Sequence, residues 1–198
     1  MNYPKTFQKL IECFEQFPGV GPKTAERYAF YAIKENKITE IENLIKTLSD
    51  SLNLIHECSI CGMITDQDIC DICSDESRSN QLMLVEDCKS IIAYEKTKAF
   101  KGRYHILKSL ISPTNGIGPE DIGLEKVIDR IRKNNITEVI IAFPANLEGE
   151  LTSLYIKKVL SKENVKVYQI GYGLPVEASI EYADEITLIK SLESKKEI

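Results

Sequence analysis

Apolar residues in the first third of the chain recur at helical spacing. Between residues 6 and 17 they lie three or four positions apart, and the same spacing returns over 23–33 and 38–55. Such spacing places the apolar side chains on one face of a helix. Residues 17–22, which are rich in glycine and proline, separate the first stretch from the second. The pattern therefore predicts three helices, the first two joined by a tight turn.

The pattern changes after residue 80. Four short apolar runs indicate buried strands, at 82–85, 104–107, 139–142 and 165–168. Helical patterns lie between these runs, at about 90–97, 124–133 and 148–160. Strands that alternate with helices form βαβ units, in which successive strands run parallel. The sequence therefore predicts a helical part followed by an α/β part with a mostly parallel sheet.

Four cysteines in two close pairs lie between these parts. Two residues separate Cys58 from Cys61, and two separate Cys70 from Cys73. Paired cysteines of this kind present four thiolates tetrahedrally to Zn²⁺, which keeps them deprotonated. Four thiolates complete the metal's coordination, so we expect one structural zinc ion per chain. Rubredoxin-type iron uses the same spacing and is the alternative metal.

An acidic, serine-rich segment, residues 74–80, follows the cysteines and is typical of a linker. It suggests where the chain divides. We predict a helical domain at 1–56, a cysteine module with its linker at 57–80, an α/β domain at 81–172 and a short C-terminal segment at 173–198.

The turn between the first two helices carries residues suited to a phosphate group. Gly19 and Gly21 allow a hairpin with outward amides, and the following helix adds unpaired N–H groups and its positive dipole end. Lys23, Thr24 and Arg27 lie where they add charge and hydrogen bonds. Such a site takes a phosphate without reading a base, which predicts contact with the DNA backbone. An ordinary helix–helix turn and a dimerisation element are alternative interpretations.

The composition limits the classes of protein. The chain of 198 residues is 43% hydrophobic and 28% charged, as in ordinary globular proteins. It has no export signal and no apolar stretch near the roughly 18 residues of a membrane span, so we expect a cytoplasmic protein without a membrane partner. In that reducing compartment, clustered cysteines bind metals rather than form disulfides.

The charge of the chain favours a local DNA contact over an extensive one. A net charge of −5 argues against a protein that wraps DNA with a strongly basic surface. This net charge is compatible with a local contact to DNA and with binding of a protein partner. The basic stretch Lys89–Lys108 is a second candidate for contact with DNA.

The α/β part resembles the Toprim domain of topoisomerases, primases and some nucleases. Glu86 ends the first strand, and Glu148 and Glu150 follow a later one. In active members, a glutamate after the first strand and an Asp-x-Asp after a later strand hold Mg²⁺ for phosphoryl chemistry. The later strand here lacks Asp-x-Asp. We therefore expect a Toprim scaffold retained for binding, with no catalytic residues; a Mg²⁺-dependent nuclease or topoisomerase-like enzyme is the alternative.

The order of these motifs resembles one family, the bacterial recombination mediator RecR. Residues 17–25 resemble the helix-hairpin-helix of DNA repair proteins, and the four cysteines and the Toprim-like part follow in the family's order. Further matches lie at 102–104, 116–119, 121–123, 148–150, 173–176 and 181–185. The chain departs from the family at Lys108-Ser109, Phe143–Asn146 and Glu177-Ala178. At the first and third of these places the family often has paired glycines.

The resemblance implies an α+β multidomain fold and a role without catalysis. RecR-like proteins assemble as rings, tetramers built from dimers, that surround DNA. They act with RecO, and in many bacteria RecF, to load recombinase onto gapped DNA. On this basis Lys23 and Arg27 face DNA phosphates, and the acidic surface at Glu148 and Glu150 contacts a RecO-like partner. The protein would then be associated with the nucleoid.

Overall fold

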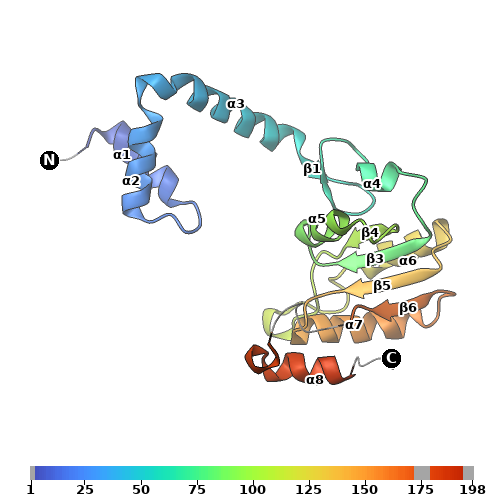
Figure 1. Ribbon diagram of the computed structural model, residues 1–198. Helices are drawn as coiled ribbons and strands as arrows, with labels where there is room; N and C mark the ends of the chain where they lie inside the picture. The colour runs from blue at the N-terminus through green and yellow to red at the C-terminus, as the bar shows by residue number, and fades with distance from the viewer. Residues whose placement is uncertain (1–2, 172–178, 194–198) are drawn as a thin grey trace. The chain divides into compact units, whose positions relative to one another are not determined.

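The computed structural model describes residues 3–171 and 179–193 (Figure 1). The chain forms two compact units, Met1–Ile55 and His56–Ile198. Among the described helices, none has both the length and the apolar character that a membrane span requires.

The first unit is helical, as predicted. Its helices are α1 (Lys5–Glu15), α2 (Pro22–Ala32) and α3 (Ile38–Leu54), and a short 3-10 turn, Glu35–Lys37, precedes α3. Pro22 occupies the first turn of α2, where its missing N–H group costs no hydrogen bond.

Aromatic side chains hold α1 against α2. The ring centroids of Phe7 and Phe30 lie 4.7 Å apart, and those of Phe14 and Tyr28 lie 5.7 Å apart. Ala25 and Ala29 are fully buried, and their small side chains let the two helices approach closely. This packing fixes the turn that joins α1 to α2.

Helix α3 has no buried residue. Its apolar side chains are largely exposed, with exposed fractions of 48% to 85% at Leu44, Ile45, Leu48 and Leu52. Their spacing places them on one face, so the periodicity that predicted the helix does not reflect packing within this unit.

The second unit contains a four-stranded parallel sheet in the order β4-β3-β5-β6. The strands are β3 (Gln81–Val85), β4 (Arg103–Ile106), β5 (Glu138–Ala142) and β6 (Lys166–Gln169). The helices between them are α5 (Cys88–Thr97), α6 (Leu124–Lys133) and α7 (Leu147–Leu160). Every neighbouring pair of strands is parallel, which confirms the prediction of βαβ units.

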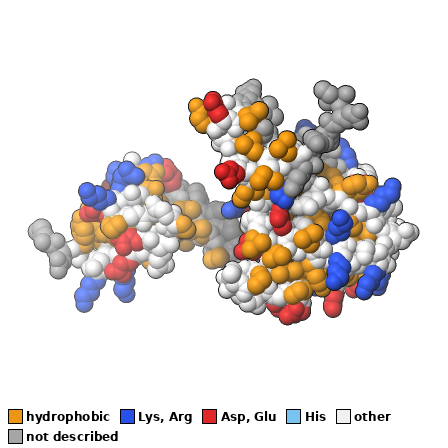
Figure 2. Space-filling view, turned by 90° about the horizontal axis from the view of Figure 1, so that it is seen from below, with side chains coloured by type: hydrophobic (Ala, Val, Ile, Leu, Met, Phe, Trp, Pro, Cys, Tyr) orange, Lys and Arg blue, Asp and Glu red, His pale blue; other side chains and the backbone are white. Residues whose placement is uncertain are grey.

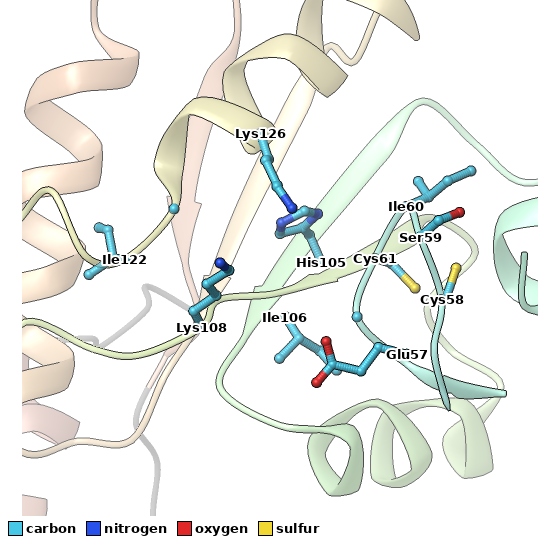
Figure 3. A pocket seen from close by; sticks show the side chains of 12 residues that line it. Glu57, Cys58, Ser59, Ile60, Cys61, His105, Ile106, Lys108, Ile122 and Lys126 are labelled. Atoms are coloured by element: carbon cyan, nitrogen blue, oxygen red, sulfur yellow. The ribbon is translucent and has the colours of Figure 1, made fainter. Parts of the chain in front are cut away.

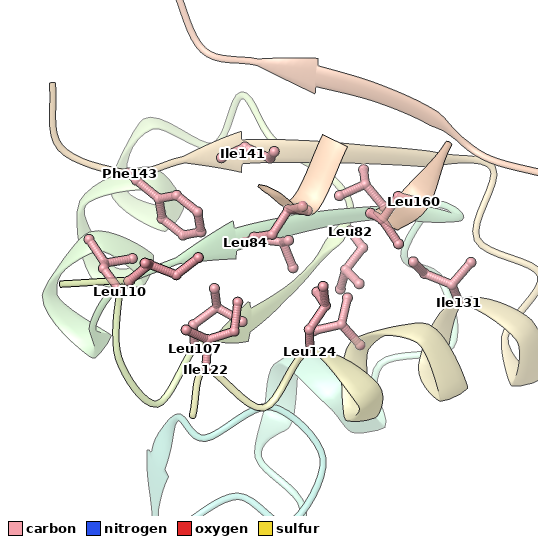
Figure 4. Packing of buried hydrophobic residues seen from close by; sticks show 14 of the residues in the cluster. Leu82, Leu84, Leu107, Leu110, Ile122, Leu124, Ile131, Ile141, Phe143 and Leu160 are labelled. Atoms are coloured by element: carbon pink, nitrogen blue, oxygen red, sulfur yellow. The ribbon is translucent and has the colours of Figure 1, made fainter. Parts of the chain in front are cut away.

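The two faces of the sheet support separate apolar clusters because successive side chains of a strand point to opposite faces. Leu82 and Leu84 of β3 belong to the larger cluster, which includes residues of α6 and α7 (Figure 4). Met83 and Val85 belong to the other cluster, together with Tyr104 and residues of α5. Strand β3 is therefore buried on both faces, which explains its uninterrupted apolar sequence.

The cysteine module is part of this second unit. It consists of β1 (His56–Glu57) paired antiparallel with β2 (Ile64–Thr65), followed by the short helix α4 (Asp71–Ser74). Met63 and Ile72 pack against the smaller cluster of the sheet. Strands of two residues are too short to produce a periodic pattern, so the sequence did not predict them.

Residues 74–80, expected to be a linker, are held in place. The Arg78 guanidinium donates to both carboxylate oxygens of Glu95, at 2.9 and 2.6 Å, and to the Gly102 carbonyl at 2.9 Å. The Ser79 amide donates to the Lys101 carbonyl at 2.9 Å. The segment predicted as a linker is therefore anchored to the α/β part, and a polar composition does not reveal partners that lie farther along the chain.

The chain ends in structure that the periodicity did not predict. A 3-10 turn, Ile180–Tyr182, precedes helix α8 (Glu185–Glu193), and Lys190 of α8 forms an ion pair with Glu150 of α7. Two features of the sequence analysis, residues 173–176 and Glu177-Ala178, lie outside the described residues.

Candidate metal centre and nucleic-acid contact

The four cysteines converge on one point. The sulfur atoms of Cys58, Cys61, Cys70 and Cys73 all lie within 4.8 Å of one another. Three of these side chains are buried and Cys73 is half-buried. Four thiolates at this separation fit one structural zinc ion per chain, with no position left for a substrate.

Backbone amides near the first cysteine pair, Cys58 and Cys61, donate hydrogen bonds to the sulfur atoms of that pair. Gly62 has a φ of +80°, a conformation that glycine adopts without steric cost, and its amide donates to the Cys58 carbonyl at 3.0 Å. The Met63 amide donates to the Cys61 sulfur at 3.5 Å, and the Cys70 amide donates to the Cys58 sulfur at 3.4 Å. Such amide–sulfur bonds stabilise thiolates and fix their orientation toward a metal.

Arg130 of α6 contributes a buried cation to this centre. Its guanidinium donates to the Cys73 sulfur at 3.3 Å and to the Tyr104 carbonyl at 2.6 Å. Without a metal, a hydrogen bond from Cys61 and then the positive charge of Arg130 lower the pKa of Cys73. Four thiolates and Zn²⁺ leave an excess of negative charge, which Arg130 partly offsets. Sequence reasoning missed this residue, because in the helical pattern of α6 it looks like a surface cation.

The metal centre is joined directly to the sheet. The Ile106 amide, at the end of β4, donates to the Cys61 carbonyl at 2.9 Å. The position that a Cβ atom would occupy at Gly62 lies 3.3 Å from the Ile106 Cβ, so a side chain there fits only if Ile106 moves by a few tenths of an ångström. The zinc ligands and the sheet therefore support one another.

The turn between α1 and α2 is open to solvent. Gly19 has a φ of +79°, and the Val20 amide closes the turn by donating to the Phe17 carbonyl at 3.0 Å. Gly21 is extended and caps α2 without a side-chain hydrogen bond. No atom lies within 4 Å of the position that a Cβ would take at Gly19 or Gly21. A phosphate group can therefore approach the backbone of this turn.

The side chains predicted to contact a phosphate lie in the first two turns of α2. Lys23 and Arg27 are exposed, and Thr24 is half-buried. Among the described residues, neither Lys23 nor Arg27 takes part in an ion pair. The Arg27 guanidinium carbon lies 5.8 Å from the centroid of the Tyr28 ring. Both cations are thus available to a ligand.

The three glutamates that the Toprim resemblance singled out do not form a metal site. Glu86 is exposed just beyond β3, and Glu148 and Glu150 lie in the first turn of α7. Within residues 3–171 and 179–193, the four cysteines are the only group of three or more potential ligands close enough to share a metal ion. Glu150 instead pairs with Lys190.

Comparison with known proteins matches every part of the chain. Family models match residues 7–52 (RecR, helix-hairpin-helix), 55–75 (the RecR zinc finger domain with four cysteines), 80–171 (Toprim domain) and 173–196 (RecR, C-terminal). The chain is 44% identical to a protein of Natranaerobius thermophilus named Recombination protein RecR. That alignment covers 100% of this chain and 99% of the relative.

Proposed function

Because the chain belongs to the RecR family, we propose that it is a non-enzymatic recombination mediator that binds the phosphate backbone of DNA. In this role it forms an oligomeric clamp on DNA in the cytoplasm, at the nucleoid. It acts with a RecO-like protein, and with a RecF-like protein where one is present, to load recombinase at gaps.

The observation that carries this proposal is the open turn before α2. Gly19 and Gly21 are exposed and their Cβ positions are open, and Lys23 and Arg27 add two cations that lack an ion pair among the described residues. Amides at a helix start and flanking cations bind phosphate oxygens regardless of base sequence. The contact therefore fits DNA of any sequence.

The test is the double variant Lys23→Ala/Arg27→Ala. Each lost phosphate contact reduces the slope of log K against log salt by about 0.9 for duplex DNA and about 0.7 for single strands. We expect the slope to fall by roughly one to two and the affinity to fall at every salt concentration. Fluorescence anisotropy with labelled DNA at several salt concentrations measures both.

Lys34→Ala/Lys46→Ala is the matched control. Both lysines are exposed on the same helical unit and lie outside the turn, so this variant removes the same charge. If the two double variants weaken binding equally, the effect is one of net charge and the turn is not the DNA contact. Unchanged binding by Lys23→Ala/Arg27→Ala has the same consequence.

The absence of catalysis is part of the proposal. Glu86, Glu148 and Glu150 are not gathered around a common point, and β5 is not followed by the Asp-x-Asp of active Toprim enzymes. Mg²⁺ chemistry on phosphates needs carboxylates that hold the ion in place. Mg²⁺-dependent nicking of DNA that is abolished by Glu86→Ala would contradict this part of the proposal.

Self-association is supported by apolar surface in each unit. In the first unit, α3 exposes the face formed by Leu44, Ile45, Leu48 and Leu52. In the second unit, Figure 2 shows apolar side chains gathered on the face that it presents. Exposed apolar side chains near the C-terminus are Ile180, Tyr182, Ile186, Ile189 and Leu192. Surfaces of this kind mark interaction sites. Two separate self-contacts would build a ring from dimers, since a single two-fold contact ends at a dimer.

We assign the RecO-like partner to the first turn of α7. Glu148 and Glu150 lie there, beside the exposed Leu147. Glu148→Lys reverses one charge at an incompletely buried position, so we expect weaker binding of the partner with unchanged folding. Calorimetric titration with the purified partner tests this assignment.

A further inference from the structure

A small cavity lies in the second unit beside the first pair of cysteines (Figure 3). Its volume is about 80 Å³. The residues around it belong to the cysteine module, to the end of β4 and to the start of α6. Two lysines, Lys108 and Lys126, reach it from different segments of the chain.

Neither lysine forms an ion pair within the described part of the chain, although the carboxylate of Glu57 also lines the cavity. Lys108 and Lys126 are both exposed. The neighbouring His105 is neutral at pH 7, because burial first, and then the charges of Arg130 and Lys126, lower its pKa to about 4. The two lysines outnumber Glu57 among the charged residues that line the cavity, and an anion between them would offset their mutual repulsion.

The backbone beside the cavity favours the same sign of ligand. Gly123 precedes α6 with a φ of +71°, and no side chain caps the helix. The Cγ and Cδ atoms of Lys108 lie 3.9 Å from the position that a Cβ would take at Gly123, so the lysine side chain passes the helix start. The uncapped helix adds a weak positive field to that of the two lysines.

The metal centre does not account for these lysines. Arg130, and not Lys108 or Lys126, donates to a cysteine sulfur. In Figure 3 the ammonium group of Lys108 lies on the side of His105 away from the sulfur atoms of Cys58 and Cys61, and that of Lys126 overlaps the His105 ring in this view. The two cations are thus directed at the cavity.

We propose that this cavity binds one phosphate group of a DNA backbone between Lys108 and Lys126. A volume of about 80 Å³ is far below the roughly 300–1,000 Å³ of pockets that enclose a small molecule, so a single oxyanion fits and a nucleotide does not. The phosphate therefore belongs to a larger molecule that remains outside. This inference rests on the DNA-binding function proposed above.

A second hollow lies next to the first and could accommodate the continuation of the DNA backbone. It shares Ser59, Ile60 and Lys126 with the first and continues along α6 to Lys133. Its walls also include Asp129, so the charge there is mixed. Of the lysine and arginine side chains in the stretch Lys89–Lys108, only Lys108 lines either hollow, which narrows the predicted DNA contact to that residue.

The test compares Lys108→Ala/Lys126→Ala with Lys162→Ala/Lys166→Ala. The control lysines are exposed at and near β6, at the opposite edge of the sheet from β4, and carry the same charge. We expect the first variant to lower the salt slope of DNA binding by roughly one and to weaken affinity roughly fivefold at about 0.1 M salt. Lys108→Arg/Lys126→Arg should retain binding, because arginine also binds phosphate.

Three outcomes overturn the inference. If the first variant and the control have equal salt slopes, the cavity takes no DNA phosphate, while a reduced slope in Lys23→Ala/Arg27→Ala would still support the proposed function. If wild-type protein binds no DNA at any salt concentration, the proposed function fails as well. If inorganic phosphate raises the thermal midpoint of the wild type but not of Lys108→Ala/Lys126→Ala, and DNA binding is equal in both, the site takes a free anion. Zinc content and the thermal midpoint of each variant verify its folding.

Discussion

At the scale of single residues, Gly62 joins the metal centre to the sheet. Its φ of +80° positions the amides that face the cysteine sulfurs, and Ile106 lies only 3.3 Å from the position that a Cβ would take. Gly116 provides a comparison, because its φ is +69° but no atom lies within 4 Å of its Cβ position. The two glycines therefore separate the cost of the backbone conformation from that of the close contact.

Gly116→Ala should lower the free energy of unfolding by about 1 kcal/mol, the cost of placing a side chain in the left-handed conformation. Gly62→Ala adds the contact with Ile106 at 3.3 Å, so we expect a loss of about 2–3 kcal/mol. Urea unfolding measures both. If both variants lose the same free energy of unfolding, the turn at Gly62 can shift away from β4.

Glu95 is a second residue whose contacts extend beyond its own helix. It accepts two hydrogen bonds from Arg78 and one from the Tyr104 hydroxyl, at 2.7 Å. The Arg78 guanidinium holds the pKa of Glu95 below its ordinary value of 4.5. A carboxylate with a lowered pKa stabilises the fold above the unfolded pKa, and that contribution is lost as pH falls through the folded pKa.

Glu95→Gln should therefore lower the free energy of unfolding by about 1 kcal/mol near neutral pH and by progressively less below pH 4.5. Its side chain is 30% exposed, so the cost stays well below that of a fully buried ion pair. Thermal unfolding from pH 3 to pH 7 measures the difference between variant and wild type. A difference that does not change with pH would show that Glu95 acts through packing alone.

At the scale of elements, the cysteine module depends on zinc. Strands β1 and β2 have two residues each and α4 has four, so these elements are too short to be stable alone. The metal supplies their missing core. The sheet has its own apolar clusters, so it depends on the metal only through contacts such as those of Met63 and Ile72.

Removal of zinc by a chelator should therefore unfold the module and lower the thermal midpoint of the second unit by several degrees or more. The expected signal is new hydrogen exchange at amides near Cys58–Ser74, with protection retained in β3 and β5. Cys70→Ser, which removes one ligand, should reproduce it. An unchanged midpoint after complete loss of zinc, measured by metal analysis, would show that the module folds without metal.

At the scale of the whole molecule, α3 determines how copies of the chain associate in our proposal. Its exposed apolar face has no partner within the first unit, since α3 buries no residue there. An amphipathic helix of this kind buries its apolar face against another surface. A second copy of the chain is the partner that the clamp requires.

Ile45→Glu/Leu48→Glu should lower the oligomeric mass in solution, because both side chains are at least half exposed within their unit and two carboxylates disfavour burial. Asn43→Glu/Thr47→Glu adds the same charge at other exposed positions of α3 and should leave the mass unchanged. Light scattering coupled to size exclusion measures both. A wild-type monomer under all conditions, including with gapped DNA, would contradict a clamp.

The sequence alone determined the helices of the first unit, the parallel sheet and the four zinc ligands. These features depend on spacing along the chain, and the periods of helices and strands and the two-residue gap between paired cysteines are local properties. The two-residue strands and α8 were not predicted, and neither was the packing of residues 74–80. Their stability comes from the metal and from contacts with distant segments.

Only the tertiary structure decided which distant residues meet. Arg130 reaches Cys73 across 57 positions of sequence, and Lys108 and Lys126 share a cavity because β4 and α6 bring their segments together. By contrast, Glu86 does not join Glu148 and Glu150 in a metal site, although all three follow strands of the same sheet. Side chains from separate elements converge only where packing of the core directs them, and local periodicity carries no information about that direction.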